Sequence, residues 1–305
     1  MTTLQLLARQ ESPEGDTRKD LLRLQDGECV EVVLLRYRDR RSVCVSTQIG
    51  CACGCVFCAT GQAGFVRQLS AEEIVAQVLH FWNELVTVGE RLSNIVLMGM
   101  GEPLLNYEQT VEAIRWLSHP RTLGFVQRRI TLSTVGIVPG IERLGGEGLY
   151  INLAVSLHAA TDELRNRLVP IGRRYDLDRL CAALREYTAR TGRRVMIEWA
   201  MIAGVNDSLD QAEALAALLQ GIPAHVNLIR LNPTSGYAGQ PATWEAIEAF
   251  TTVLDRAGIP HTLRQQRGVA IRAGCGQLRQ AQVSGITQSL PCVGRTTDRI
   301  VGADL

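Results

Sequence analysis

The feature that most constrains the fold is a regular alternation of apolar strand patterns and amphipathic helical patterns. Each of five apolar runs is followed by a segment whose apolar residues keep helical spacing. These runs cover 94–99, 128–134, 150–158, 194–202 and 225–231. Units of about thirty residues that repeat this order predict a parallel sheet or barrel with right-handed crossovers. We therefore expect an α/β fold.

The N-terminal part of the chain departs from this alternation. Residues 29–37 and 42–47 are β-branched runs separated by a charged turn, which predicts a β-hairpin. The more polar residues before them suggest an arm with one short helix near 21–26. The predicted organisation is a polar arm over 1–27, a core with the hairpin over 28–278, and a flexible tail over 279–305.

Composition narrows the class of protein. A net charge of +1 and a pI near 7.6 fall short of the basic footprint of a general nucleic-acid binder, so any RNA role depends on local features. The first residues are too polar for a signal peptide, and no apolar run reaches the roughly 18 residues of a membrane span. We expect a cytoplasmic protein with no membrane partner, in which nine cysteines indicate metal binding or catalysis rather than disulfides.

Four of these cysteines lie within residues 50–62. Cys51, Cys55 and Cys58 have the spacing C-x-x-x-C-x-x-C, and three thiolates on one loop can bind three irons of a cubane cluster while the fourth iron stays open. The alternative is a zinc knuckle, which needs a fourth ligand such as Cys53 or a histidine. The sequence has no second short knuckle, which favours the cluster. In that interpretation Cys53 is a spare thiol that points away from the ligands.

The cysteine spacing, with Phe57 just before the last cysteine, resembles the signature of the radical S-adenosylmethionine superfamily. The segment GMGEP, residues 99–103, resembles that superfamily's methionine-binding turn. The resemblance implies a partial (β/α)6 barrel with an N-terminal β-hairpin extension, and a [4Fe-4S] cluster held by the three cysteines. It also implies that S-adenosylmethionine binds the open iron and is cleaved to a 5′-deoxyadenosyl radical by one electron. A reductant such as flavodoxin or ferredoxin is then an expected partner.

Longer segments resemble the RlmN and Cfr family of RNA adenosine methyltransferases, in the family's order and at similar spacing. They are CVSTQIGC (44–51), GFVRQL (64–69), MGMGEPLLN (98–106), RRITLSTVGIVPGI (128–141), LAVSLHA (153–159), NLIRLNP (227–233) and RAGCGQL (272–278). The resemblance implies methylation of adenine at carbon C2 or C8, with 23S rRNA, tRNA or both as the RNA partner. These carbons are poor nucleophiles, so a radical route is required.

The same resemblance assigns three catalytic residues. One S-adenosylmethionine methylates Cys275, and a second supplies the radical that removes hydrogen from this methyl group, so that a methylene radical adds to adenine. Glu31 then accepts the proton of the substrate carbon, and Cys44 releases the product by forming a disulfide with Cys275. Without the resemblance, Glu31 would suit a solvent-facing strand position, and both thiols would suit a core. The glycines that flank Cys275 instead favour a mobile, exposed backbone.

Cofactor contacts are implied at the ends of several predicted strands. They are Gly101, Glu102, Ser133, Ser156, Leu157, His158 and Asn232. Any one of these residues would also suit a capping role. Because functional groups in such folds gather at the carboxyl ends of the strands, we expect them on one rim.

Two departures from the family pattern leave the substrate open. The additional N-terminal helical domain usual in the family has no counterpart before the hairpin, and Val269 and Ala270 stand where acidic residues are usual in C2-specific members. The resemblance favours C2, while these departures keep both carbons and both RNAs open. A small heteroaromatic substrate and a zinc-stabilised RNA-binding module are the alternative functions. Basic residues expected to contact phosphate are Arg173, Arg174, Arg264 and Arg267.

Overall fold

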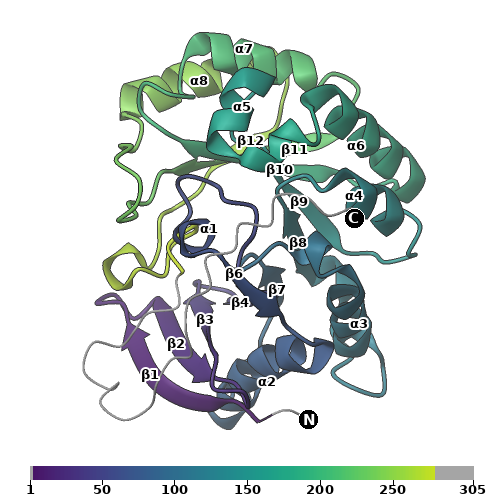
Figure 1. Cartoon of the computed structure of the whole chain (residues 1–305), viewed down its shortest axis with the longest axis vertical. Coiled ribbons are helices and arrows are strands. Elements are labelled where there is room, and N and C mark those ends of the chain that lie inside the picture. The colour runs from purple at the N-terminus through teal and green to yellow at the C-terminus, as the bar shows by residue number, and fades with distance from the viewer. Residues whose placement is uncertain (1–2, 279–305) are drawn as a thin grey trace.

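Six parallel strands, each followed by at least one helix, form the centre of the molecule (Figure 1). The structure is a computed structural model and describes residues 3–278. The strands are β4 (Arg41–Cys44), β7 (Asn94–Leu97), β8 (Ile130–Thr134), β9 (Asn152–Ser156), β10 (Val195–Met201) and β11 (Ala224–Arg230). They pair in this order, and β12 (His261–Leu263) adds a further parallel strand beside β11. The predicted α/β fold with six strand–helix units is confirmed.

Helices cover the outer face of this curved sheet (Figure 1). They are α2 (Ala71–Thr87), α3 (Tyr107–Ser118), α4 (Val138–Leu144), α5 (Asp162–Leu168), α6 (Leu177–Thr191), α7 (Leu209–Leu218) and α8 (Trp244–Arg256). The apolar side of each helix packs on the strands, and the contact between Trp199 of β10 and Phe250 of α8, with ring centroids 5.6 Å apart, is an example. Full burial of such large side chains stabilises the fold by roughly 1.5–3 kcal/mol each.

Short elements line the connections at the carboxyl ends of the strands and elsewhere. They are β5 (Gln48–Gly50), α1 (Ala59–Ala63), β6 (Phe65–Gln68) and the 3-10 turns η1 (Pro103–Leu105), η2 (Gln127–Arg129), η3 (Pro170–Arg173) and η4 (Val269–Ile271). β5 and β6 form a separate antiparallel pair that brackets the cysteine loop. Among the described residues, no helix combines the length and the apolar character needed to cross a bilayer.

The N-terminal residues differ from the expected polar arm. They form β1 (Gln5–Glu11) and β2 (Thr17–Arg23), which pair antiparallel with each other and then with β3 (Cys29–Arg36). The helix expected near 21–26 is wrong, because β2 lies between two other strands that satisfy its backbone on both sides and bury Leu22 completely. The predicted hairpin is confirmed as β3 and β4. The extension is therefore a three-stranded antiparallel sheet joined to the barrel through β4.

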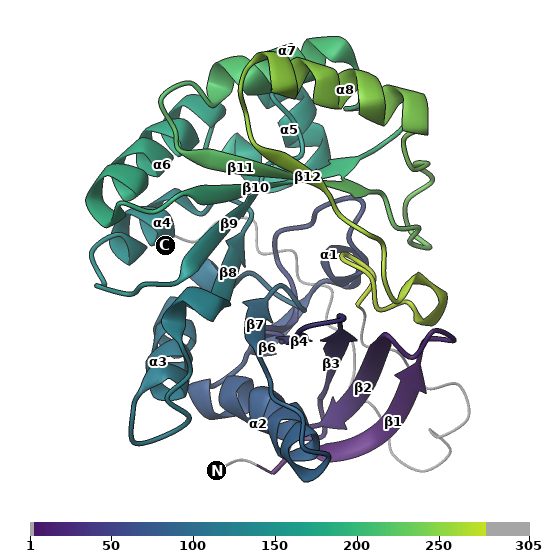
Figure 2. The same ribbon diagram turned by 180° about the vertical axis from the view of Figure 1, so that it is seen from behind.

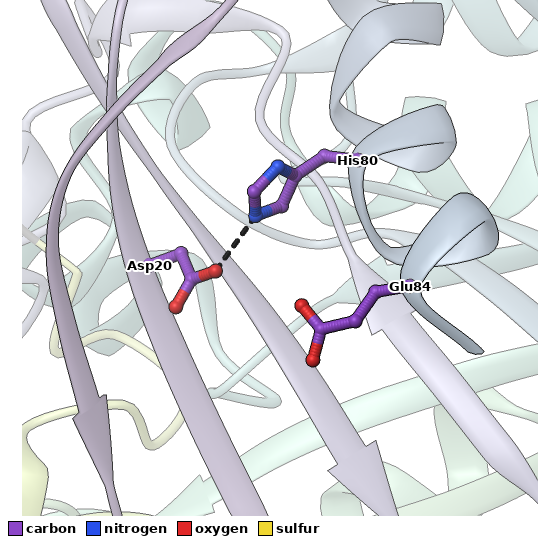
Figure 3. A group of neighbouring side chains, drawn as sticks. All are labelled: Asp20, His80 and Glu84. Atoms are coloured by element: carbon purple, nitrogen blue, oxygen red, sulfur yellow. Dashed lines mark hydrogen bonds and ion pairs between the residues drawn. The ribbon is translucent and has the colours of Figure 1, made fainter. Parts of the chain in front are cut away.

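A network of charged side chains attaches this extension to α2 (Figure 3). Asp20 of β2 accepts hydrogen bonds from His80 Nε2 at 2.7 Å and from Arg9 Nε and Nη2 at 2.9 and 2.7 Å. Glu84 of α2 pairs with Arg9 at 2.7 Å and with Arg18. Asp20, His80 and Glu84 lie close enough to bind a cation, but the two guanidinium groups already neutralise their carboxylates. The cluster is an ion-pair network.

Replacing Asp20 with Asn should lower the free energy of unfolding at neutral pH by about 1.5–3 kcal/mol, because hydrogen bonds to a buried charged acceptor are lost. Burial favours a raised pKa for Asp20, but hydrogen bonds from His80 and Arg9 outweigh it and hold the pKa below its ordinary value. The stability that Asp20 contributes is fully present above its pKa in the unfolded state, near 3.9, and is lost as the pH falls through its pKa in the folded state. Denaturant unfolding between pH 3 and 7 should show a weaker acid dependence in D20N.

The matched control is Glu108→Gln, which removes the carboxylate of an exposed ion pair with Arg143. Exposed pairs contribute little, so this variant should unfold like the unmodified chain. Equal destabilisation by the two substitutions would contradict the structural importance of the Asp20 network.

Candidate active site at the carboxyl ends of the strands

The cysteine loop lies where the carboxyl end of the first barrel strand leads into β5 and α1. Cys51 follows β5 directly, and its backbone N–H donates to Gly64 O at 2.7 Å. Cys58 is the N-cap residue of α1. Burial raises the pKa of its thiol, and the neighbouring backbone of Gly61 and Thr60 opposes this rise. The loop therefore holds its thiols in a buried position where backbone N–H groups offset part of the cost of a negative charge.

The three predicted ligands lie close enough for their charges to interact. Burial raises the pKa of the Cys55 thiol well above its ordinary value, and the charges of Cys58 and Cys51 raise it further. Within residues 3–278, these thiols do not form a group whose ligand atoms all lie within 4.8 Å of one another. A single tetrahedral zinc would hold its sulfurs about 3.8 Å apart, since each Zn–S bond is about 2.3 Å. A cubane binds each thiolate to a different iron, so this donor set fits a cluster better than zinc.

Cys53 differs from the expectation that it points away from the ligands. It is buried, and its thiol hydrogen-bonds to Cys51, which lowers the pKa of the Cys51 thiol. The reason is the tight turn of the loop, which directs the side chain of the second residue after Cys51 back toward it. Cys53 is thus a neighbour of the ligand set that stabilises the charge on one of its members.

The buried guanidinium of Arg165 places a positive charge near these thiols. Its Nη2 donates to Val135 O at 2.6 Å and its Nη1 to Tyr175 O at 3.1 Å, while its Nε has no hydrogen-bond partner among the described residues. Its charge favours the thiolate of Cys55. Sequence reasoning missed Arg165, because an arginine inside a polar helix pattern is usually exposed. This cation also suits an anionic metal–thiolate group.

The predicted methionine-binding turn closes over the cysteine loop. Gly101 has a φ of +100°, and a Cβ there would lie 2.5 Å from the Cβ of Gln48, so only glycine fits. The Glu102 carboxylate is buried and accepts from Leu104 N at 2.9 Å and from Val135 N at 2.8 Å. Burial raises the pKa of Glu102 to about 7. This carboxylate links the segments that follow β7 and β8.

The next cofactor candidates lie at the ends of β8 and β9. Ser133 and Ser156 are half-buried near the carboxyl ends of their strands, and Leu157 is buried. His158 has a φ of +60°, and its ring packs edge-on against Phe57 of the cysteine loop at 4.9 Å between centroids. The predicted rim therefore brings these segments together.

The imidazole of His158 is neutral at physiological pH. Burial, assisted by the charge of Arg165, lowers its pKa to about 3. Its Nδ1 accepts from the backbone N–H of Ala200 at 2.9 Å, so the ring proton is on Nε2. His158 can therefore donate one hydrogen bond to a ligand without carrying charge.

The segment that carries Cys275 follows β12 and returns to the N-terminal extension. Figure 2 shows this yellow segment beside the ends of β1 and β2. Arg267 contacts Asp16, and a Cβ at Gly268 would lie 2.6 Å from Thr17 Cγ2. Tyr37, the residue that follows β3, contributes as well, because the Arg267 guanidinium lies over its ring, 4.6 Å from the centroid. The extension thus supports one side of the Cys275 segment.

The other side of the Cys275 segment is held by the barrel. Asn232 Nδ2 donates to Cys275 O at 3.0 Å, and Ala59 N, next to Cys58, donates to Gly276 O at 2.7 Å. A Cβ at Gly274 would lie 2.8 Å from Asn232 Nδ2, and Gly276 has a φ of +78°. The flanking glycines therefore permit close packing and a left-handed turn. The prediction that Cys275 is exposed is confirmed.

The two distant thiols lie near each other. Burial raises the pKa of Cys44 to about 12, and the charge of Cys275 contributes to this rise. The pKa of Cys275 is also raised, because its sulfur is desolvated although the residue as a whole is exposed. The charges of Glu198 and Cys58 add to this rise and the charge of Arg264 opposes it. Cys44 and Cys275 are separated by most of the chain, yet they share one electrostatic environment.

Glu31 lies on the same face of the sheet as Cys44. Cys44 pairs with Val33, and side chains two residues apart on a strand point to the same side. The alternative of a solvent-facing carboxylate is wrong: the Glu31 side chain is 2% exposed and pairs with Lys19 Nζ at 2.9 Å. β2 covers this position, which no pattern within β3 alone could reveal.

Glu198 of β10 is a second acidic residue in this interior that sequence reasoning missed. Its Oε1 accepts from Asn227 Nδ2 at 2.8 Å and from Arg264 Nη2 at 3.2 Å. Burial raises the pKa of Glu198, which the Arg264 charge opposes. Its place between apolar residues in a strand sequence gave no sign that it faces the barrel interior near Cys275.

Comparison with known proteins agrees with this geometry. Residues 45–216 match the family model of the radical SAM superfamily. The chain is 52% identical over 280 residues to "Dual-specificity RNA methyltransferase RlmN 1" of Myxococcus xanthus, covering 92% of this chain and 78% of that protein. The chain belongs to the RlmN family of radical SAM RNA methyltransferases. It is also 48% identical to "Ribosomal RNA large subunit methyltransferase N" of Nitrosopumilus maritimus, covering 88% of this chain and 78% of that protein.

A solved structure supports the same assignment. A radical SAM methyltransferase from Sphaerobacter thermophilus superposes with a TM-score of 0.90 at 49% identity, covering 92% of this chain and 82% of that chain. As an RlmN family member the chain is an RNA methyltransferase, so the zinc-stabilised binding module and the small heteroaromatic substrate are set aside. Membership of the superfamily also implies a [4Fe-4S] cluster and S-adenosylmethionine.

Cys55→Ala should lose most of the iron that the unmodified chain binds, because one of three thiolate ligands is removed. Anaerobic reconstitution of the unmodified chain should give about four irons and four sulfides per molecule. The matched control is Cys53→Ala, which removes a buried thiol of the same loop and should retain the iron. Equal iron in both variants, or one zinc per unmodified chain, would contradict the ligand assignment.

Proposed function

We propose that this enzyme methylates an adenosine carbon, C2 in preference to C8, in 23S rRNA, tRNA or both, through an S-methyl group on Cys275. The observation that carries this proposal is the arrangement of Cys44, Cys275 and Glu31. The pKa of Cys44 responds to the charge of Cys275, and Glu31 lies on the same sheet face as Cys44. This chemistry requires one thiol that carries the methyl group, a second thiol that releases it, and a carboxylate that accepts a proton.

The cysteine loop and the strand-end rim would hold the cofactors. In this proposal Cys51, Cys55 and Cys58 bind the cluster. S-adenosylmethionine is contacted by Gly101, Glu102, Ser133, Ser156, Leu157, His158 and Asn232. When bound, the pair supplies a 5′-deoxyadenosyl radical after transfer of one electron. The neutral His158 offers an N–H to the cofactor, and the buried Glu102 excludes water and keeps the turn in place.

Asn232 has a second task in this proposal. Its Nδ2 already donates to the Cys275 carbonyl and its Oδ1 accepts from Gln266 Nε2 at 2.9 Å. A residue that contacts both the cofactor and the Cys275 backbone would keep the methyl group beside the radical source. Asn232 therefore couples the two parts of the site.

Each thiol has an environment that suits its proposed role. Cys275 is exposed, so it can reach S-adenosylmethionine and then the RNA. Cys44 is half-buried, and its pKa near 12 keeps it protonated at neutral pH. A protonated thiol is a poor nucleophile, so Cys44 does not readily form a disulfide before the adduct exists. Glu31 takes the proton from the substrate carbon before Cys44 releases the product.

RNA and a small electron carrier such as flavodoxin or ferredoxin are the proposed partners, which places the reaction in the cytoplasm, where thiols stay reduced.

Of the four arginines expected to contact phosphate, Arg264 and Arg267 already pair with Glu198 and Asp16. Arg173 and Arg174 are exposed beside the cysteine loop, where Leu168 O accepts from Val56 N at 3.1 Å. We therefore assign phosphate contacts to these two residues.

Cys44→Ala purified from cells should carry RNA attached covalently through Cys275, because the adduct forms and no thiol releases it. Nuclease digestion, sequencing of the attached fragment and mass spectrometry of the linked nucleoside would name the RNA and the carbon. The double variant Cys44→Ala/Cys275→Ala is the control and should carry none. A Cys44→Ala protein without attached RNA, although it binds iron and cleaves S-adenosylmethionine, would refute the proposed route.

Arg173→Ala and Arg174→Ala should each weaken RNA binding and reduce the slope of log affinity against log salt by about 0.7–0.9 per lost phosphate contact. Filter binding between 50 and 300 mM salt measures this slope. The control is Arg121→Ala, an exposed arginine in the loop between α3 and β8, at the opposite ends of the strands. Equal slopes for all three variants would remove the assignment.

A further inference from the structure

The chain has a single lysine, Lys19, among 32 lysine and arginine residues. It lies in the middle of β2, and its side chain is 9% exposed. Its Nζ is 2.9 Å from Glu31 Oε1 and 3.3 Å from the carbonyl oxygen of Arg272. Lysine is rarely buried without paired partners, and here the partners are a proposed catalytic carboxylate and the backbone of the Cys275 segment.

The register of the strands explains why Lys19 reaches this place. Lys19 pairs with Val33 and Leu21 pairs with Glu31, so Lys19 and Glu31 are diagonal neighbours on one sheet face. Cys44 is opposite Val33 on the next strand and shares that face. Arg18 and Asp20 point to the other face, toward α2. Because side chains alternate along β2, Arg18 and Asp20 join the ion-pair network on one face of the sheet. Lys19 points to the other face, toward the proposed site.

The shape of the ammonium group suits its two partners. Lysine presents three donors on a compact head, whereas the guanidinium group of arginine is a wide planar fork. The Lys19 ammonium contacts a carboxylate on β3 and a carbonyl on a separate segment within one enclosed position. In a chain that otherwise uses arginine, this position holds the smaller cation.

The second partner ties Lys19 to the methyl carrier. Arg272 precedes Cys275 by three residues and has a φ of +52°, a left-handed conformation that is unfavourable for a residue with a Cβ. Its carbonyl accepts from Lys19, and Ala273 N donates to Gly268 O at 2.8 Å. The lysine thus contacts the turn that sets the position of Cys275.

We propose that Lys19 is a positioning residue of the methyl transfer. Its ammonium holds the Glu31 carboxylate in one orientation and connects it to the Cys275 segment, so that proton acceptor and methyl carrier keep a fixed separation. After the methylene radical has added to the ring, the C–H bond of the substrate carbon breaks and its proton passes to a Glu31 oxygen. Its electron pair restores the ring double bond, and the unpaired electron left by the addition passes to a one-electron acceptor of the iron–sulfur type. This inference rests on the proposed function.

The test compares Lys19→Met with the unmodified chain, both purified from cells and reconstituted anaerobically. Cys275 methylation and adduct formation should proceed in Lys19→Met, because they precede the proton transfer. The adduct should persist although Cys44 is intact, with release slowed at least tenfold. RNA carrying deuterium at C2 and C8 of adenine should slow release further in this variant. A solely structural role for Lys19 would not produce that isotope effect.

Three further variants separate the explanations. Lys19→Arg keeps the charge and should restore part of the release rate. Glu31→Gln should trap the adduct, and adding Lys19→Met to it should cause no further loss, since the lysine acts through Glu31. Arg18→Met removes a charge from the opposite face of the same strand and should leave release unchanged. If Lys19→Met fails to fold, Lys19→Gln, which keeps a donor for the Arg272 carbonyl, replaces it.

Release at the unmodified rate in Lys19→Met, or loss of Cys275 methylation together with adduct formation, would overturn the inference. The Cys44→Ala variant distinguishes failure of the Lys19 inference from failure of the proposed function. If Cys44→Ala traps RNA while the lysine variants release normally, only the role of Lys19 is refuted. If Cys44→Ala traps no RNA, the route itself is refuted.

Discussion

The structure depends on the two pairings made by β4. This short strand pairs antiparallel with β3 on one side and parallel with β7 on the other, so it joins a hairpin-type sheet to a barrel. Cys44 is at its carboxyl end, where the cysteine loop begins and where Val33 of β3 is directly opposite. A single strand therefore places a thiol, a neighbouring carboxylate and the cysteine loop at the same end of the barrel.

The Cys275 segment is the second part of the site, and it is held from both directions. Asn232 and Ala59 bind its carbonyl groups from the barrel, while Lys19 binds the Arg272 carbonyl from the extension. Because one anchor belongs to the extension and the others to the barrel, the position of the thiol depends on how these two parts of the ten-stranded sheet pack together. In the proposed function, the extension therefore contributes to the active site through Lys19 and Glu31.

Charge is distributed unevenly over this interior. Cysteine thiols, Glu102, Glu198 and Glu31 contribute potential negative charge, and Arg165, Arg264 and Lys19 oppose it at separate points. Burial keeps His158 neutral and Cys44 protonated. Since each group is desolvated, small differences in distance decide its protonation state. Such an interior suits a reaction in which methylation, proton transfer and disulfide formation follow one another without interference.

The sequence by itself determined the strand–helix alternation, the cysteine spacing and the motifs at the strand ends, because periodicity and short spacing are local properties. It failed for residues 17–23, where pairing on both sides overrides local preference, and it could not show that Glu31 is buried beside Lys19. The proximity of Cys44 to Cys275 was implied only by resemblance. Tertiary structure alone decided these contacts, because they depend on register between strands and on segments more than 200 residues apart, for which no single stretch of sequence carries a signal.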